Sequence, residues 1–311
     1  MIPVDLVTGF LGSGKTTFIT EYAKHLSSKG LKTAVIVNDY GAINVDRMML
    51  TKSLEGVAHV EMFIGGDMDC SRRRLKTKLI ALAMDKYEYV IIEPSGVFDT
   101  DDFLDLIYDE PLDKWYRMGS IISIVSSELD MDMSYESRYL LASQTAKAGT
   151  VVYSKPLAER YNEILNYINK SLAEFKCERT IREMYCWNLG SITSDEFERI
   201  SESGYTSGDM IKLPVVEDGQ FSSEFFFHVE TPIKDLQETI KGIFNDEEAG
   251  NIYRLKGYIL NKMGMWLEVN ATKNNVSVVP VDVGQEVFIV IGENLDAEKI
   301  GAHWDAYRNV P

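Results

Sequence analysis

The sequence has few cysteines, few histidines and no long apolar run. Three cysteines in 311 residues are too few, and odd in number, for a disulfide framework, which favours a reducing compartment. The chain opens without a cationic segment followed by an apolar one, and runs such as Val287 to Ile291 are far shorter than a membrane span. We therefore expect a cytoplasmic protein with no leader and no membrane partner. None of the four histidines lies within one helical turn of another, which argues against a histidine-rich metal site.

Positive charge is also scarce. The chain carries 32 lysines and arginines against 48 acidic residues, a formal net charge of −16. Such a surface repels phosphate backbones, so we expect no nucleic-acid partner. The apolar content of 45% is ordinary for a chain that buries a core, and 311 residues leave room for about two domains.

Short apolar segments alternate with helical patterns through the first part of the chain. Alternation of this kind indicates βαβ units, a mostly parallel sheet and helices on both faces. We therefore predict an α/β fold over residues 1–190, with a mostly parallel sheet and helices on both faces. The predicted strands are residues 4–8, 33–37, 59–64, 89–92, 120–125 and 150–153, and a helix is expected to open at Pro156.

The composition then changes twice. Residues 191–220 are rich in serine, acidic residues and glycine, which predicts an acidic surface helix and a linker. Residues 221–311 contain more strand patterns than helix patterns, which predicts a smaller α+β domain with an antiparallel sheet. Its predicted strands are residues 225–229, 252–260, 265–269, 276–281 and 287–291, with helices over 233–244 and 297–307.

Residues 9–16 fit the pattern G-x-x-x-x-G-K-[ST], between a predicted strand and a predicted helix. Glycines let the backbone curl so that successive N–H groups converge on phosphate oxygens at a helix N-terminus. The lysine reaches the β- and γ-phosphates, and the threonine hydroxyl binds Mg²⁺. The motif identifies the predicted fold of residues 1–190 as the P-loop NTPase type. It predicts a nucleotide site that contains Gly12, Ser13, Gly14, Lys15, Thr16 and Thr17.

Hydrolysis also needs acids near the magnesium and the attacking water, at the ends of neighbouring strands. Glu93 ends an apolar strand, and the N–H of Gly96 could reach the γ-phosphate. Asp39 ends the second strand, and Asp46 lies in the loop that follows; either could approach Mg²⁺. Lys15, Glu93 and Asp39 are the predicted catalytic residues. Surface acids in turns are the alternative interpretation, with more weight for Asp39 than for Glu93.

These segments together resemble the CobW-like GTPases, also described as cobalamin-synthesis or nitrile-hydratase-activator proteins. The resemblance rests on residues 9–17, on residues 38–46 and on Glu93-Pro94-Ser95-Gly96, and it continues into residues 253–257 and 290–296. It implies a GTP-dependent metallochaperone or maturation factor, in which nucleotide binding is coupled to metal transfer. The implied partners are a nucleotide and a client metalloenzyme or corrinoid-related protein, and a homodimer stays open.

The sequence departs from this family at the metal motif. Where the family has Gly-Cys-x-Cys-Cys, residues 66–70 read Gly-Asp-Met-Asp-Cys. The resemblance places a transition-metal site at Asp67, Asp69 and Cys70, with Zn²⁺ or Co²⁺ as the expected ion. Two carboxylates and one thiolate form a harder ligand set than three thiolates and should bind such an ion more weakly. Arg72 to Arg74 could instead pair with the two aspartates, and this structural interpretation is slightly favoured.

A second departure concerns the base. GTPases of this kind usually carry Asn-Lys-x-Asp, whose carboxylate accepts hydrogen bonds from guanine, whereas residues 154–157 read Ser-Lys-Pro-Leu. Ser154 and Lys155 are still expected to line the base site, but Leu157 can accept nothing, and Glu159 is the alternative acceptor. GTP is the first expectation and ATP the second, each with Mg²⁺.

Two further functions stay open. The altered cysteine motif is compatible with a nucleotide-gated interaction or reactivation protein that no longer carries metal. A small-molecule kinase could use the same phosphate loop, but apart from Arg72 to Arg74 we find no arginine-rich lid segment.

Overall fold

The computed structural model describes residues 1–39, 50–64, 68–94, 100–211, 221–230, 233–261 and 263–308. The chain divides into two compact units, Met1–Leu213 and Pro214–Pro311, and each is described by itself. In the described part of the chain, no helix combines the length and apolar content needed to cross a membrane.

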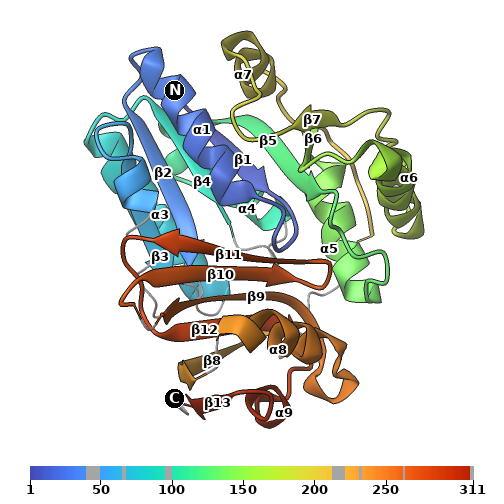
Figure 1. The fold of residues 1–311 in the computed structure, drawn as a ribbon. Helices are drawn as coiled ribbons and strands as arrows, with labels where there is room; N and C mark the ends of the chain where they lie inside the picture. Colours follow the sequence, from blue (N-terminus) through green and yellow to red (C-terminus); the bar gives the residue numbers. More distant parts are fainter. Residues whose placement is uncertain are drawn as a thin grey trace. The chain divides into compact units, whose positions relative to one another are not determined.

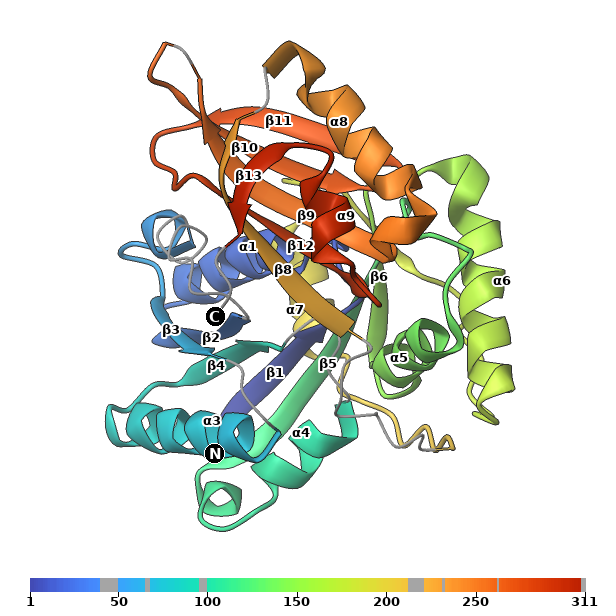
Figure 2. The same cartoon turned by 90° about the horizontal axis from the view of Figure 1, so that it is seen from below.

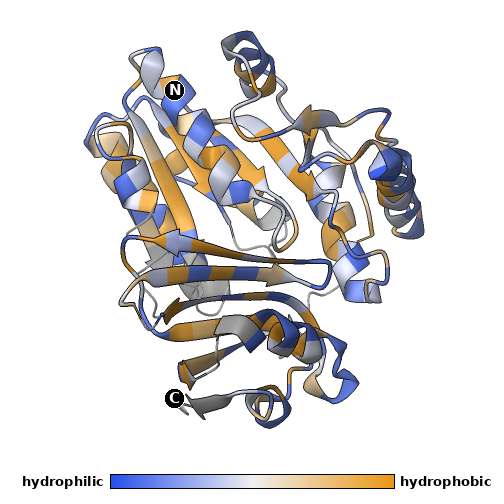
Figure 3. Cartoon of the chain, in the orientation of Figure 1, coloured by the Kyte–Doolittle hydropathy of each residue, from blue (hydrophilic) through white to orange (hydrophobic). Residues whose placement is uncertain are grey.

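The first unit is built on a seven-stranded sheet in the order β3-β2-β4-β1-β5-β6-β7 (Figure 1). Every neighbouring pair is parallel, so the carboxyl ends of all seven strands meet at one edge. The central strands are hydrophobic over most of their length, as expected for a sheet covered on both faces (Figure 3). The strands are β1 (Ile2–Thr8), β2 (Thr33–Asp39), β3 (His59–Ile64), β4 (Tyr89–Glu93), β5 (Tyr116–Ser126), β6 (Thr150–Ser154) and β7 (Tyr185–Trp187).

Helices cover both faces of this sheet, which confirms the predicted fold class. Figure 2 shows α1 (Lys15–Ser28) on one face and α3 (Met68–Met84) and α4 (Thr100–Ile107) on the other. Further described helices of the unit include η1 (Leu112–Lys114), α5 (Tyr135–Ala146), α6 (Ala158–Glu174) and α7 (Ser194–Ser201). Phe197 and Ile200 of α7 pack with Phe18 and Tyr22 of α1 in one buried cluster. The acidic helix predicted within residues 191–220 is therefore packed against the first unit.

A buried carboxylate lies in the middle of β1. Asp5 is fully buried, and its Oδ2 accepts hydrogen bonds from the hydroxyls of Tyr22, at 2.6 Å, and Tyr89, at 2.8 Å. Its Oδ1 accepts the N–H of Ser120 at 2.7 Å. A side chain at Gly119 would collide with this carboxylate, because a Cβ there would lie 2.1 Å from Oδ1. Burial raises the pKa of Asp5 to about 6, although these hydrogen bonds lower it in part.

This carboxylate makes stability depend on pH. Between its ordinary pKa of 3.8 and about 6, Asp5 is protonated in the folded chain and ionised in the unfolded chain, so stability falls as pH rises. Relative to Asp5→Asn, the parent should lose about 2 kcal/mol of unfolding free energy between roughly pH 4.5 and pH 7.5. Urea unfolding of both proteins at the two pH values measures this difference. The exposed Asp105→Asn is the control, and a parent whose pH profile matches that of Asp5→Asn would contradict the assignment.

The second unit is a six-stranded antiparallel sheet in the order β11-β10-β9-β12-β8-β13, which confirms the predicted α+β architecture. Its strands are β8 (Phe221–Glu230), β9 (Asn251–Leu260), β10 (Trp266–Thr272), β11 (Asn275–Val281), β12 (Val287–Glu293) and β13 (Asp305–Arg308). Helices α8 (Ile233–Asn245) and α9 (Ala297–Gly301) and the turn η2 (Glu247–Ala249) complete the unit. The two α-helices pack on one face of the sheet, where Leu236, Ile240 and Ile300 meet Leu255 and Phe288.

The predicted helix over residues 297–307 is wrong beyond Gly301. The chain leaves α9 at this glycine, and residues 305–308 pair with β8 at the edge of the sheet. Between them, Trp304 is buried and packs on the rings of Phe226 and Phe288. Glycine is a poor helix former, and burial of the indole together with pairing to an open strand edge outweighs a further helical turn.

Candidate functional site

The phosphate loop joins the end of β1 to the start of α1. Gly14 precedes the helix with a φ of 95°, a left-handed conformation that favours glycine. Gly9 has a φ of 144°, and a Cβ there would lie 2.2 Å from the carbonyl oxygen of Ile124. The backbone therefore turns tightly against β5 before it enters α1. The N–H groups of the first helical turn have no partner within the helix, which makes this end suited to an anion.

Lys15 lies inside this loop. Its side chain is buried, with the residue 7% exposed, and its Nζ donates hydrogen bonds to the carbonyl oxygens of Gly9, at 2.9 Å, and Phe10, at 3.2 Å. A buried ammonium needs such compensation. Phosphate oxygens could replace these carbonyls without moving the charge out of the site.

Thr16 and Glu93 meet beside the loop. Glu93 is the last residue of β4, which is the direct neighbour of β1, and it is 7% exposed. The Thr16 hydroxyl lies 3.0 Å from each carboxylate oxygen of Glu93 and donates to this group. A hydroxyl and a carboxylate are the hard oxygen groups that Mg²⁺ prefers. The pair therefore fits the inner or outer sphere of a magnesium ion bound with a nucleotide.

Several buried polar atoms at this edge of the sheet have no hydrogen-bond partner among the described residues. They include the Ser13 hydroxyl within the loop, Oδ1 of Asn38 near the end of β2, and the hydroxyls of Thr8 and Ser123. Thr8, the last residue of β1, is the register partner of Ser123, which lies three residues before the end of β5. Folded proteins rarely leave such groups unpaired, so a cluster of them points to a place where water or a ligand binds.

The strands on the other side of β1 also reach the loop. The Ser154 hydroxyl, at the end of β6, donates to the Ser13 carbonyl at 2.6 Å. Lys155 forms an ion pair with Glu128 and is about half exposed. The structure thus brings Ser13, Lys15, Thr16, Glu93 and Ser154 together at one edge of the sheet. Lys155 follows directly, in the left-handed conformation with a φ of 50°.

Two residues at this edge were missed by sequence analysis. The ring of Trp187, at the end of β7, lies 3.5 Å from the position that a Cβ on Gly14 would take. Its Nε1 donates to Glu21 of α1 at 2.9 Å. No local motif marks Trp187 or Glu21. The only available signal was the short apolar segment before Asn188, which is compatible with a strand that ends at Trp187.

Other predicted residues lie outside what the structure describes. Asp39 is the last residue of β2, so its backbone lies at the carboxyl edge of the sheet, where the phosphate loop also lies. Its side chain is outside the described part. Asp46, Gly96 and Asp67 lie outside the described residues, as do the side chains of Asp69 and Cys70 in α3. Among the side chains that are described, no group of three or more histidine, cysteine or acidic residues could hold a metal. Gly12, Gly14 and the exposed Thr17 lie in the loop or the first turn of α1.

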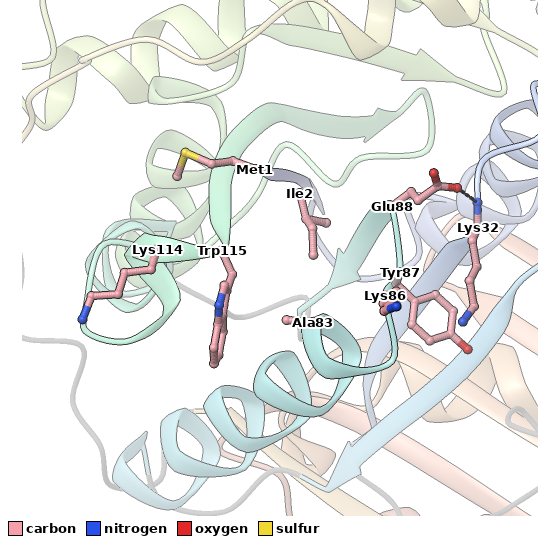
Figure 4. A pocket seen from close by; sticks show the side chains of 9 residues that line it. All are labelled: Met1, Ile2, Lys32, Ala83, Lys86, Tyr87, Glu88, Lys114 and Trp115. Atoms are coloured by element: carbon pink, nitrogen blue, oxygen red, sulfur yellow. Dashed lines mark hydrogen bonds between the residues drawn. The ribbon is translucent and has the colours of Figure 1, made fainter.

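A cavity of about 600 Å³ lies at the opposite edge of the sheet (Figure 4). It is lined by Ile2, the first residue of β1, and by Lys32, Tyr87 and Glu88 near the starts of β2 and β4. Lys32 is held there, with its Nζ donating to the Asp85 carbonyl at 2.7 Å and its N–H to Glu88 at 2.9 Å. In open parallel sheets, ligands bind at the carboxyl ends of the strands, so this cavity is not part of the phosphate site.

Comparison with known proteins identifies the family. Residues 3–182, more than half of the chain, match the nucleotide-binding domain described as CobW/HypB/UreG. The chain belongs to the CobW/HypB/UreG family. The resemblance indicated by the phosphate loop and by Glu93-Pro94-Ser95-Gly96 is thereby confirmed.

Relatives within this family include metal chaperones. The chain is 31% identical over 157 residues to the zinc chaperone YeiR of Escherichia coli, covering 50% of this chain and 47% of that protein. It is 39% identical over 108 residues to zinc-regulated GTPase metalloprotein activator 1 of Dictyostelium discoideum, covering 31% and 22%. The chain thus spans about half or less of the length of these curated relatives. The Zn(II)-bound YjiA GTPase of E. coli aligns over 97% of both chains, with 17% identity and a TM-score of 0.39.

Proposed function

We propose that the chain binds a nucleoside triphosphate with Mg²⁺, hydrolyses it slowly, and uses the cycle to deliver metal to, or mature, a client metalloenzyme in the cytoplasm. The phosphate loop is the observation that supports nucleotide binding. In it, the buried Lys15 donates to loop carbonyl oxygens, and Thr16 donates to Glu93. Family membership supports the second part, since YeiR is a zinc chaperone and the Dictyostelium relative a zinc-regulated GTPase.

Each residue has a role in this proposal. Lys15 exchanges its two carbonyl partners for phosphate oxygens and offsets the charge that develops on them. Thr16 and Glu93 would hold Mg²⁺, directly or through water, and Asp39 and Asp46 are further candidates for its ligand sphere. When bound, this ion would neutralise negative charge on the phosphates. Glu93 or Asp39 orients the attacking water, and Gly96 donates its N–H to the γ-phosphate.

The cargo site is proposed at Asp67, Asp69 and Cys70. These residues precede or begin α3, which follows β3 in the chain. We propose Zn²⁺ or Co²⁺ as the cargo, bound through one thiolate and two carboxylates. The client is then a metalloenzyme or a corrinoid-related protein that accepts the ion, and a homodimer is one arrangement in which the chain could act.

Metal titration tests this part of the proposal. The parent should bind one equivalent of Co²⁺, and its thiolate-to-Co²⁺ absorption band should vanish in Cys70→Ala. Cys186→Ala, which removes an exposed cysteine of β7, is the matched control and should leave the band unchanged. An identical spectrum in the parent and in Cys70→Ala would contradict metal carriage at this site.

A second function is favoured by the loss of two family cysteines at positions 67 and 69. In that case the chain is a nucleotide-gated protein that remodels or reactivates a partner and carries no metal. Nucleotide binding without any Co²⁺ or Zn²⁺ binding above background would support this function over delivery.

A further inference from the structure

The loops after β6 and β7 flank the phosphate loop on the side away from Glu93. The strand order places β4 on one side of β1, and β5, β6 and β7 on the other. Ser154 and Trp187 are register partners, and both approach the loop, at Ser13 and Gly14 respectively. In the proposed function, Thr16 and Glu93 mark the γ-phosphate end of the nucleotide. The nucleoside then extends toward the loops after β6 and β7.

The loop after β6 offers no acceptor side chain at the position where this family of GTPases has a carboxylate. Leu157 is 43% exposed, and its carbonyl oxygen accepts the Tyr153 hydroxyl at 3.0 Å. Lys155 is paired with Glu128. An exposed leucine and a lysine stem can cover the face of a base but cannot distinguish its hydrogen-bonding edge.

The loop after β7 is held firmly and presents an amide. Glu21 accepts the N–H of Gly190 at 2.5 Å with one oxygen and the Trp187 indole with the other. The backbone of Asn188 is closed into a turn, since its N–H donates to the Ser191 hydroxyl at 2.9 Å. The side chain of Asn188 is exposed and forms no hydrogen bond with any described residue. Leu189 beside it is 72% exposed.

We propose that Asn188 reads the hydrogen-bonding edge of the base, and that the chain consequently binds GTP and ATP with affinities within about tenfold of each other. The inference rests on the proposed function. A carboxamide carries both a donor and an acceptor, so by turning over it can match O6 and N1–H of guanine or N1 and N6–H of adenine. A carboxylate only accepts, and thus favours guanine, which presents two donors. Leu189 would cover one face of either base.

Competition against a fluorescent GTP analogue in the presence of Mg²⁺ tests this with the full chain. Asn188→Asp should shift the ratio of affinities toward GTP by about tenfold or more, because its carboxylate accepts from guanine and repels N1 of adenine. Asn188→Leu should weaken GTP and ATP by a similar factor and leave their ratio unchanged. Asn162→Asp, an exposed asparagine of α6, is the control for the added charge and should change neither affinity.

Two results would overturn the inference in distinguishable ways. A preference above about 100-fold for one base, unchanged in both Asn188 variants, would show that another group reads the base while the nucleotide site itself stands. No binding of either nucleotide to the parent would overturn the proposed function and this inference with it.

Discussion

Replacing Lys15 with alanine is expected to weaken nucleoside triphosphate binding by about 10- to 100-fold, since a hydrogen bond to a charged group contributes about 1.5–3 kcal/mol. The Nζ of Lys15 already lies inside the loop, bound to the carbonyls of Gly9 and Phe10. These partners are weaker acceptors than phosphate, so the ammonium gains more from a ligand than it loses from the loop. Titration of a fluorescent nucleotide measures the effect.

The control is Lys24→Ala on the same helix. Lys24 is exposed, and its replacement removes the same charge, so the Lys24→Ala variant should bind nucleotide as the parent does. Thermal unfolding of Lys15→Ala without nucleotide separates a binding defect from a folding defect, because the variant also leaves two loop carbonyls without their ammonium partner. A folded Lys15→Ala protein that binds as the parent does would contradict the phosphate site.

Glu93→Gln should keep nucleotide affinity within about threefold and reduce hydrolysis by about 10²- to 10⁴-fold, the usual contribution of a group that activates water by general acid–base catalysis. The amide oxygen of glutamine can still accept from Thr16, so the local structure at the end of β4 is preserved. The same amide oxygen can still face Mg²⁺ or its water shell, whereas the negative charge that orients the attacking water is lost. Phosphate release under saturating nucleotide and Mg²⁺ measures the rate.

Glu55→Gln, an exposed acid, serves as the control and should hydrolyse at the parent rate. Asp39→Asn is the informative companion, because Asp39 ends the neighbouring strand β2. If Glu93→Gln hydrolyses normally while Asp39→Asn does not, the water is oriented from β2 and the role proposed for Glu93 is wrong. Loss of rate in Glu93→Gln alone supports the proposed arrangement.

The phosphate loop could be predicted because its parts are adjacent in the sequence. Gly9, Gly14 and Lys15 lie within seven residues, and each residue type follows from the local backbone and the charge of the ligand. Glu93 could also be predicted from local sequence, because it ends an apolar strand and the carboxyl ends of parallel strands share one edge. The family resemblance rested in large part on these short segments, and the match over residues 3–182 confirms the family.

Contacts between distant segments could not be predicted in this way. Glu21 meets Trp187 and Gly190, which lie 166 and 169 residues along the chain, and Ser154 meets Ser13 across 141 residues. Which side chains face each other there depends on the order of the strands and on the length of each loop. The end of α9 was missed for a related reason. The sequence pattern over residues 297–307 favours a helix, but residues 305–308 pair with the open edge of β8. That edge exists only in the assembled sheet.

The buried acid of β1 gave no signal either. Asp5 sits within the apolar strand that was predicted over residues 4–8, and the two tyrosines that bond it lie in α1 and β4. Aspartate is almost never fully buried unless it is paired, and the sequence does not show which residues would pair with it. The carboxylate can be buried because the folded chain brings β1, α1 and β4 together around it and because Gly119 leaves room for it.

The central claim is that the loop between β1 and α1 holds the phosphates of a nucleotide. Calorimetric titration of the full chain with a non-hydrolysable GTP analogue, with and without Mg²⁺, tests it most directly. Saturable binding of one nucleotide per chain, tightened by Mg²⁺, is the predicted result. The absence of saturable heat up to millimolar nucleotide, with or without the ion, would contradict it.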